Sequence, residues 1–296
     1  MSRVGCEAAH PTHSIFAILA PMKNIKIGFI GGGNMTRSLV GGLIADGFAA
    51  EHIYVSDPDA QQLTALHTRF PVHTATDNEA TARAADVLVL AVKPQILHSV
   101  ATALSATVQA HCPLIVTIAA GVREADLQRW LGGGLAIVRA MPNTPALVQS
   151  GATALYANDQ VSAGQRSRAE SILRAVGMTL WLTDESQMDA VTALSGSGPA
   201  YFFLIMEALE TAGVRLGLDA ASARLLTLQT AFGAAKMALE SQEGAGELRA
   251  RVTSKGGTTE QAIKVLEAGG LPALLDQAVA AACERSRELA ALLGKS

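Results

Sequence analysis

Residues 28–36 read GFIGGGNMT, and this stretch decides the fold of the N-terminal half of the chain. It joins a short apolar run at 25–30 (IKIGFI) to an amphipathic segment at 34–46, which is followed by Gly47. The run predicts a β-strand, and the segment after the glycines predicts a helix that ends at Gly47. A strand, a glycine-rich turn and a helix in this order are typical of a dinucleotide-binding fold.

Each glycine of this turn has a physical role in that interpretation. Gly31 would make the tight turn, and Gly33 would let the backbone approach a pyrophosphate that the amides and dipole of the helix N-terminus stabilise. Thr36 replaces the third glycine of the usual GxGxxG pattern, so the contact between helix and strand must accommodate its side chain. The alternative is a glycine turn that binds no ligand.

Working outward, strands and helices alternate as far as about residue 184. Apolar runs bounded by turn residues predict further strands at 52–56, 86–92, 114–120, 135–140, 152–157 and 179–182. Amphipathic segments predict helices at 60–70, 95–107, 123–131 and 162–176. Such alternation predicts an α/β fold, a Rossmann-like doubly wound parallel sheet with helices on both faces.

Residues 185–296 predict helices alone. The segments 200–216, 220–240 and 272–293 are long, alanine-rich and apolar on nearly every side. Helices of this kind need burial on more than one face, and about 110 residues provide little core of their own. We therefore expect a dinucleotide-binding domain at 22–184 and an all-α dimerisation domain at 185–296 that packs against a second copy. A self-contained helical bundle is the alternative.

Composition excludes several classes of protein. The 296 residues are 49% hydrophobic and carry a formal net charge of −3, so neither disorder nor nucleic-acid binding is indicated. No apolar run reaches the roughly 18 residues of a membrane span. Three scattered cysteines, Cys6, Cys112 and Cys283, favour the cytoplasm over an oxidising compartment and provide no zinc-binding pattern. We predict no metal site and no membrane association.

The first 21 residues do not fit the dinucleotide-binding pattern. Residues 14–20 (SIFAILA) follow Arg3 and faintly resemble a signal peptide, but the run is short and a strand follows soon after. We expect residues 1–21 to be a disordered extension, with Met22 as the functional start.

Polar residues at the ends of the predicted strands supply further candidates for the cofactor site. Ser56 and Asp57 end the second strand, where an acidic residue normally accepts hydrogen bonds from the adenosine ribose of NADH and repels a 2′-phosphate. Asp57 can equally start a turn with Pro58. The loops at 91–94 (AVKP) and 119–121 (AAG) also follow strands. Lys93 has the character of a phosphate ligand, although an exposed loop lysine is an equal alternative.

The motifs together resemble one family, the pyrroline-5-carboxylate reductases. In order along the chain they are GFIGGGNM (28–35), AVKP (91–94), AAG (119–121), VRAMPNTP (138–145), SGSGPAY (195–201) and VTSKGGTTEQA (252–262). The resemblance spans residues 26 to about 290, and the GGTT segment is its most specific part. Two departures are Lys255, where the family commonly has proline, and residues 56–58 (SDP), where many NADPH-preferring members have a serine-asparagine-arginine type of sequence.

The resemblance implies a reaction and its site. The chain would reduce 1-pyrroline-5-carboxylate, a cyclic imine, to L-proline with NADPH or NADH, as a homodimer or a ring of dimers. The cofactor-binding residues would be Gly31, Gly33, Asn34, Met35, Thr36, Ser56, Asp57, Asn78, Ala91, Val92, Lys93, Pro94, Ala119, Ala120, Gly121 and Asn143. The substrate-binding residues would be Ser197, Ser254, Gly257, Thr258 and Thr259, with Thr259 also catalytic.

The GGTT segment makes physical sense as a carboxylate clamp. The amides of Gly257, Thr258 and Thr259 would lie at a helix N-terminus, which favours an anion. The Thr259 hydroxyl could then reach the imine nitrogen. A plain helix start is the alternative, because threonine is a good N-cap residue. The loop at 195–199 would line the substrate pocket through Ser197 or simply connect two helices.

Two other functions remain as alternatives. All seven histidines lie at or before His111, so the helical half lacks the strong base that oxidation of a hydroxyl usually needs. A β-hydroxyacid dehydrogenase would need an interdomain lysine, and Lys236 is the one lysine in the helices of 200–242. A dinucleotide-binding sensor would leave the GGTT segment unexplained. An imine needs little acid–base machinery, and its reduction depends mainly on close positioning.

Overall fold

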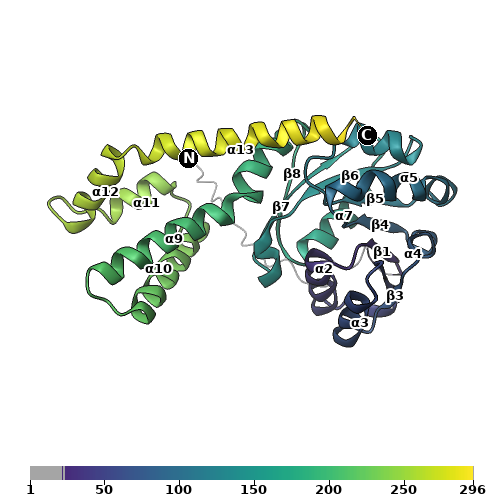
Figure 1. The fold of residues 1–296 in the computed structure, drawn as a ribbon, viewed down its shortest axis with the longest axis horizontal. Helices are drawn as coiled ribbons and strands as arrows, with labels where there is room; N and C mark the ends of the chain where they lie inside the picture. Colours follow the sequence, from purple (N-terminus) through teal and green to yellow (C-terminus); the bar gives the residue numbers. More distant parts are fainter. Residues whose placement is uncertain (1–21, 23, 296) are drawn as a thin grey trace, which may run out of the picture. The chain divides into compact units, whose positions relative to one another are not determined.

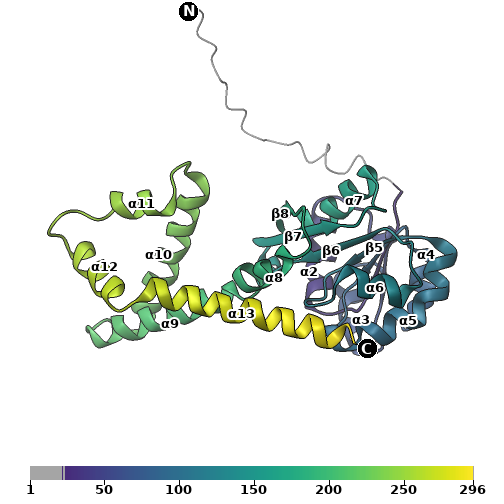
Figure 2. The same cartoon turned by 90° about the horizontal axis from the view of Figure 1, so that it is seen from above.

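The computed structural model describes residue 22 and residues 24–295, so the expected extension at 1–21 lies outside the described residues. The chain forms two compact units (Figures 1 and 2). The first consists of the described residues up to Val191 together with those from Ser286 onward, and the second is Thr192–Arg285. No pattern in the sequence indicated that the last residues return to the first unit.

An eight-stranded sheet is the centre of the first unit, with strand order β3-β2-β1-β4-β5-β6-β7-β8. The strands are β1 (Ile27–Ile30), β2 (Ile53–Ser56), β3 (His73–Ala75), β4 (Val87–Leu90), β5 (Leu114–Thr117), β6 (Ile137–Met141), β7 (Gly151–Ala157) and β8 (Gly177–Trp181). The expected Rossmann-like α/β fold is confirmed. Strands β1, β4 and β5 are buried along their whole length, as their continuous apolar runs predict.

Strand β7 corrects the expectation of a parallel sheet, because it pairs antiparallel with β6. The connection between these strands contains only a short 3-10 helix, Thr144–Val148. A parallel crossover usually needs a dozen or more residues and a full helix, so this short link turns the chain back on itself. Strand β8 is again parallel to β7, across helix α7.

Helices cover both faces of the sheet (Figure 1). In the first unit they are α2 (Asn34–Ala45), α3 (Ala60–Arg69), α4 (Asn78–Ala84), α5 (Pro94–His111), α6 (Glu124–Leu131), α7 (Ala163–Arg174) and α8 (Gln187–Val191). One apolar core joins α2, α3 and α7 to the sheet, and a second core joins α4, α5 and α6 to it. The sequence did not predict β3 and α4, which are short elements.

Helix α2 carries the glycine-rich turn, and Gly42 fixes its distance from α7. A Cβ atom at Gly42 would lie 2.2 Å from the carbonyl oxygen of Ala175, which directly follows α7. No side chain fits at such a separation without a backbone shift. Because Gly42 has no side chain, α2 can pack this close to the end of α7. The contact thereby fixes the position of α2, whose N-terminus faces the cofactor region.

We expect Gly42→Ala to lower the free energy of unfolding by about 2–3 kcal/mol, since the added methyl group overpacks the contact with Ala175. Gly164→Ala is the matched control, because a Cβ at Gly164 in α7 meets no atom within 4 Å. That change should be neutral or stabilising by up to about 1 kcal/mol. Urea unfolding at one fixed protein concentration measures both, and equal midpoints for the two variants would contradict the packing argument.

The second unit is helical. Its elements are the π-helical turn Thr192–Gly196, α9 (Gly198–Arg215), α10 (Ala220–Glu240), α11 (Ala245–Arg251), α12 (Thr258–Ala268) and the larger part of α13 (Leu271–Leu293). Helices α9 and α10 pack on each other through small residues, with Gly213 against Ala223. Among the described residues, no helix is both long and apolar enough to cross a bilayer.

Large apolar side chains on α9 and α10 remain exposed. They are Phe202, Phe203, Leu204, Ile205, Leu209, Val214, Leu225, Leu226, Leu228, Phe232, Met237 and Leu239. Patches of this size on one chain mark a surface that another protein covers. The self-contained bundle considered from the sequence would have buried these side chains.

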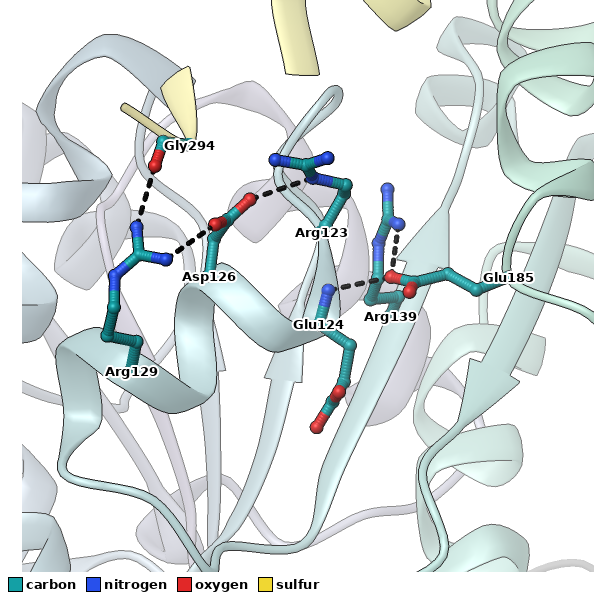
Figure 3. Close-up of polar contacts among 7 residues, drawn as sticks. All are labelled: Arg123, Glu124, Asp126, Arg129, Arg139, Glu185 and Gly294. Carbon is teal, nitrogen blue, oxygen red and sulfur yellow. Dashed lines mark hydrogen bonds and ion pairs between the residues drawn. The ribbon is translucent and has the colours of Figure 1, made fainter. Parts of the chain in front are cut away.

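Polar contacts fasten the end of α13 within the first unit (Figure 3). The buried carboxylate of Asp126 accepts from Arg123 Nε at 2.9 Å and from Arg129 Nη1 at 3.0 Å. Arg129 Nη2 donates to the carbonyl oxygen of Gly294 at 2.7 Å. Ser286 Oγ donates to Asp189 Oδ1 at 2.6 Å, which joins α13 to α8.

A second polar cluster holds the segment that leads into α8. The largely buried Arg139 of β6 forms an ion pair with Glu185, and the Glu124 amide donates to the same Glu185 oxygen at 2.6 Å (Figure 3). Burial, with smaller contributions from the charges of Glu185 and Glu124, raises the pKa of the Tyr156 phenol. These contacts fix the last part of the first unit before the chain enters the helical unit.

Candidate active site

The glycine-rich turn has the geometry that the sequence predicted. Gly31 has φ +105°, and a Cβ there would lie 2.7 Å from the carbonyl oxygen of Ala91, so only glycine fits. Gly33 is the N-cap residue of α2, and a Cβ there would meet nothing within 4 Å. Open space therefore lies beside the first amides of α2. This backbone fits the pyrophosphate of a dinucleotide.

Thr36 fits the position of the missing third glycine. Its side chain is fully buried, and its hydroxyl donates to the Gly31 carbonyl oxygen at 2.6 Å. The hydroxyl therefore stabilises the turn from within the first turn of α2. Asn34 and Met35 occupy the first two positions of that helix, Asn34 with an exposed side chain.

The end of β2 adjoins this turn. The carboxylate of Asp57 accepts from the Gly32 amide at 2.7 Å and from the Asp59 amide at 2.9 Å, one on each oxygen. Asp57 thus starts a turn of its own, as one of the two sequence alternatives held, and it also contacts the glycine turn. Its binding to a ribose stays a prediction. The buried Ser56 hydroxyl donates to Asn78 Oδ1 at 2.7 Å. Asn78 is the first residue of α4.

The next three strand ends supply the remaining candidates of the first unit, and the first of these follows β4. Ala91 and Val92 follow β4. Lys93 is exposed and is the N-cap residue of α5, and Pro94 is the first residue of that helix. Ala91 is tied to the glycine strand, because its amide donates to Ile30 at 2.9 Å. This placement brings the loop at 91–94 beside Gly31.

The loop after β5 is more enclosed. Ala119 is buried, Ala120 is half-buried, and Gly121 has φ +73°. A Cβ at Gly121 would lie 3.6 Å from side-chain atoms of Leu289 and Leu293 on the last turns of α13. The end of α13 therefore closes one side of this loop.

Asn143 lies in the loop after β6. Its Oδ1 accepts from the Ala152 amide at 2.8 Å and so fastens this loop to β7. Part of its hydrogen-bonding capacity is therefore used within the protein, which the sequence did not indicate.

In the helical unit, the GGTT segment begins α12 as predicted. Gly257 is the N-cap residue, and Thr258 and Thr259 occupy the first turn. The Gly257 amide donates to the Ser254 carbonyl oxygen at 3.0 Å, so it belongs to the preceding turn. The amides of Thr258 and Thr259, like all first-turn amides, have no partner within their helix. These amides, with the half-buried Thr259 side chain, are the groups offered to an anion.

Glu260 is a residue of this site that the sequence analysis missed. One carboxylate oxygen accepts from the Gly256 amide at 2.7 Å, and the other lies 3.2 Å from Lys264 Nζ. The signal was present, since a glutamate three residues after an N-cap residue often returns to the helix start. Glu260 thereby holds the glycine turn in place, and Lys264 offsets part of its charge.

The predicted site residues thus fall into two groups, one on each unit. The first unit brings the glycine turn, Ser56, Asp57, Asn78 and the loop at 91–94 together around the N-terminus of α2. In the second unit, Ser254, Gly257, Thr258 and Thr259 share one turn, whereas Ser197 precedes α9 and its amide donates to Thr192.

The composition of both groups bears on metals. Among the described residues, no three His, Cys, Asp or Glu side chains are grouped so that they could hold a metal ion.

The lysine of the alternative dehydrogenase reading is exposed. Lys236 forms an ion pair with Glu240 at 3.8 Å along α10. An exposed lysine in such a pair has no feature of a buried catalytic base.

Comparison with known proteins gives consistent results for both halves of the chain. The profile described as "Pyrroline-5-carboxylate reductase dimerisation" matches residues 185–289, and the profile described as "NADP oxidoreductase coenzyme F420-dependent" matches residues 26–121. The pyrroline-5-carboxylate reductase of Pseudomonas aeruginosa is 53% identical over 274 residues, which is 93% of this chain and 100% of that protein. The one from Haemophilus influenzae is 43% identical over 92% of this chain and 100% of that protein.

Solved structures show the same similarity. A pyrroline-5-carboxylate reductase structure from Coxiella burnetii is 49% identical, with a TM-score of 0.87 over 90% of this chain and 99% of that one. A Plasmodium falciparum pyrroline carboxylate reductase structure with NADP bound is 32% identical, with a TM-score of 0.81 over the same shares.

Proposed function

The chain belongs to the pyrroline-5-carboxylate reductase family, and from this premise we propose how its own residues carry out the reaction. It is an NAD(P)H-dependent oxidoreductase of proline biosynthesis, which reduces the cyclic imine 1-pyrroline-5-carboxylate to L-proline. We assign cofactor binding to a domain at 22–184 and substrate binding to a helical domain at 185–296.

The observation that carries this assignment is the start of α12. Two first-turn amides and a threonine hydroxyl lie side by side there, at the positive end of a helix dipole. The substrate has a carboxylate on the carbon next to its ring nitrogen. The amides of Thr258 and Thr259 would bind this carboxylate, and the Thr259 hydroxyl would then hydrogen-bond to the nitrogen.

The cofactor supplies a hydride, which adds to the imine carbon while the ring nitrogen gains a proton. The residues at 31–36 would hold the pyrophosphate through backbone amides, and Ser56, Asp57 and Asn78 would surround the adenosine. The loops at 91–94 and 119–121 and Asn143 would continue the cofactor site along the carboxyl ends of the strands. The protein contributes mainly positioning, because an imine accepts hydride without a strong base.

The dimerisation profile indicates a homo-oligomer. The exposed apolar side chains of α9 and α10 support a homodimer formed through the helical unit, and a ring of dimers is the larger assembly that we propose. We place the reaction in the cytoplasm, which suits a chain with three widely spaced cysteines.

The direct test is oxidation of NADPH and NADH by the purified full-length protein with 1-pyrroline-5-carboxylate, followed by absorbance of the reduced nicotinamide. Turnover that yields L-proline is the expected result. Lys236→Met is the matched control, since an exposed α10 lysine should contribute nothing to imine reduction. A folded protein that binds either cofactor but turns over hydroxy acids instead of the imine, and loses this activity in Lys236→Met, would refute the proposal.

A further inference from the structure

A cleft of about 460 Å³ is lined by α2, the end of α3 and the short 3-10 helix after β6, and its lining is positively charged. Its lining residues are Asn34, Arg37, Ser38, Gly41, Gly42, Ala45, Arg69, Phe70, Ala146, Leu147 and Gln149. The lining therefore contains two guanidinium groups and no carboxylate. A cleft with this composition favours an anion, and guanidinium groups bind phosphate especially well.

Arg37 is the cation at the cofactor end of this cleft, in the first turn of α2. Its Nη2 donates to Gln62 Oε1 at 3.1 Å, and no carboxylate of the described residues forms an ion pair with it. Its Nε is buried and has no hydrogen-bond partner among the described residues. Buried donors normally have an acceptor, so the guanidinium of Arg37 is incompletely paired within the described part of the chain.

Hydrogen bonds connect Arg37 to the corner that receives the adenosine ribose. Gln62 lies in the first turn of α3, and its amide donates to the capping residue Asp59 at 3.4 Å. The Asp59 amide in turn donates to Asp57, which accepts from the glycine turn. Arg37 therefore adjoins the loop after β2, where the ribose 2′-substituent lies in dinucleotide-binding folds.

Arg37 offsets a charge that would otherwise exclude a phosphate. The Asp57 carboxylate accepts one backbone amide on each oxygen, and a carboxylate at this place repels a 2′-phosphate. No arginine stands next to Asp57 in the sequence, and α2 supplies one from 20 residues earlier in the chain.

Arg69, the other arginine of the cleft, is the last residue of α3, and its guanidinium carbon lies 5.1 Å from the centre of the Phe70 ring.

We propose that Arg37 binds the 2′-phosphate of NADPH and so allows this chain to use NADPH in spite of Asp57. This assignment rests on the proposed function and adds to it the residue that recognises the 2′-phosphate, the group that distinguishes NADPH from NADH. Arg69, at the opposite end of α3, has no part in it.

The first test compares kcat/KM for NADPH and NADH in the wild type, Arg37→Met, Arg37→Lys and the control Arg69→Met. Arg37→Met should lower kcat/KM for NADPH by about 10- to 100-fold, mainly through KM, because a charged hydrogen bond is lost. NADH should change by less than about twofold, Arg37→Lys should recover part of the loss, and Arg69→Met should keep the wild-type ratio. An unchanged NADPH-to-NADH ratio in Arg37→Met would overturn the assignment.

The second test needs no turnover. Calorimetry should show that Arg37→Met raises the dissociation constant for 2′,5′-ADP by about 10- to 100-fold and leaves the dissociation constant for 5′-AMP unchanged. Equal weakening of both ligands would overturn the assignment. If the wild type binds both nucleotides but does not reduce the imine, the proposed function fails, while this binding measurement still decides the role of Arg37.

A third measurement separates the 2′-phosphate from a free anion in the same cleft. Inorganic phosphate should inhibit competitively with NADPH and leave NADH-dependent turnover unaffected at equal ionic strength. Equal inhibition with both cofactors, abolished by Arg69→Met, would mean that the cleft binds free phosphate and would overturn the assignment.

Discussion

Replacement of Thr259 by alanine is expected to lower kcat for 1-pyrroline-5-carboxylate by about 100-fold, the size of effect seen when one preorganised hydrogen-bond donor is removed. Thr259 lies in the first turn of α12, where its hydroxyl would contact the ring nitrogen as charge changes during hydride addition. The variant keeps the backbone amides that would bind the carboxylate. We therefore expect kcat to fall far more than substrate affinity, as measured by initial rates of NADPH oxidation.

Thr259→Ser is the matched control, because it keeps the hydroxyl and removes only a methyl group. It should retain kcat within a few-fold of the wild type. The dissociation constant for the cofactor should be the same in all three proteins, because the glycine turn belongs to the other unit. Wild-type kcat in Thr259→Ala, with unchanged circular dichroism, would show that the hydroxyl has no catalytic role.

Phe203→Glu is expected to convert the homo-oligomer into monomers at micromolar protein concentration. Phe203 lies on α9 with 64% of its surface exposed, although burial of a phenylalanine gains about 1.5–3 kcal/mol. In a twofold symmetric interface each substitution counts twice, and an unpaired buried carboxylate adds a further cost. The dissociation constant of the dimer should therefore rise by roughly a thousandfold or more.

Sedimentation equilibrium of the full-length chain measures this change. His111→Glu is the control, since it places the same charge on an exposed residue at the end of α5 in the first unit. That variant should keep the wild-type assembly. If Phe203→Glu sediments as the wild type does, α9 does not form the subunit interface and the exposed apolar face needs another partner.

The sequence predicted most of the fold because its signals were local. Apolar runs bounded by turn residues identified β4 and β5, and the glycine turn identified the β1–α2 connection. Strand β3 has only three residues, none of them strongly apolar, and so it gave no signal. Strand β7 runs antiparallel to β6 because the connection between them is too short for a crossover helix. The regular alternation of strands and helices elsewhere in the sequence suggested a parallel strand instead.

The site shows the same division between local and distant information. The start of α12 was predictable, because Gly257 and two threonines form a recognisable helix start. The contacts of Arg37 were not, since its partner Gln62 lies 25 residues away and becomes a neighbour only when α2 and α3 pack together. Asp57 was read as a ribose acceptor or a turn residue, and its bond to Gly32 depends on the pairing of β1 with β2.

The return of the last residues to the first unit has a consequence for biosynthesis. The unit is incomplete until Ser286 and the following residues have contacted Asp189, Gly121 and Arg129. The ribosome adds about 5–20 residues per second, so the 94 residues between Val191 and Ser286 take about 5–20 s to synthesise. During that interval the nascent chain would carry the whole sheet, while the loop at 119–121 still lacks the apolar side chains of α13 that cover it.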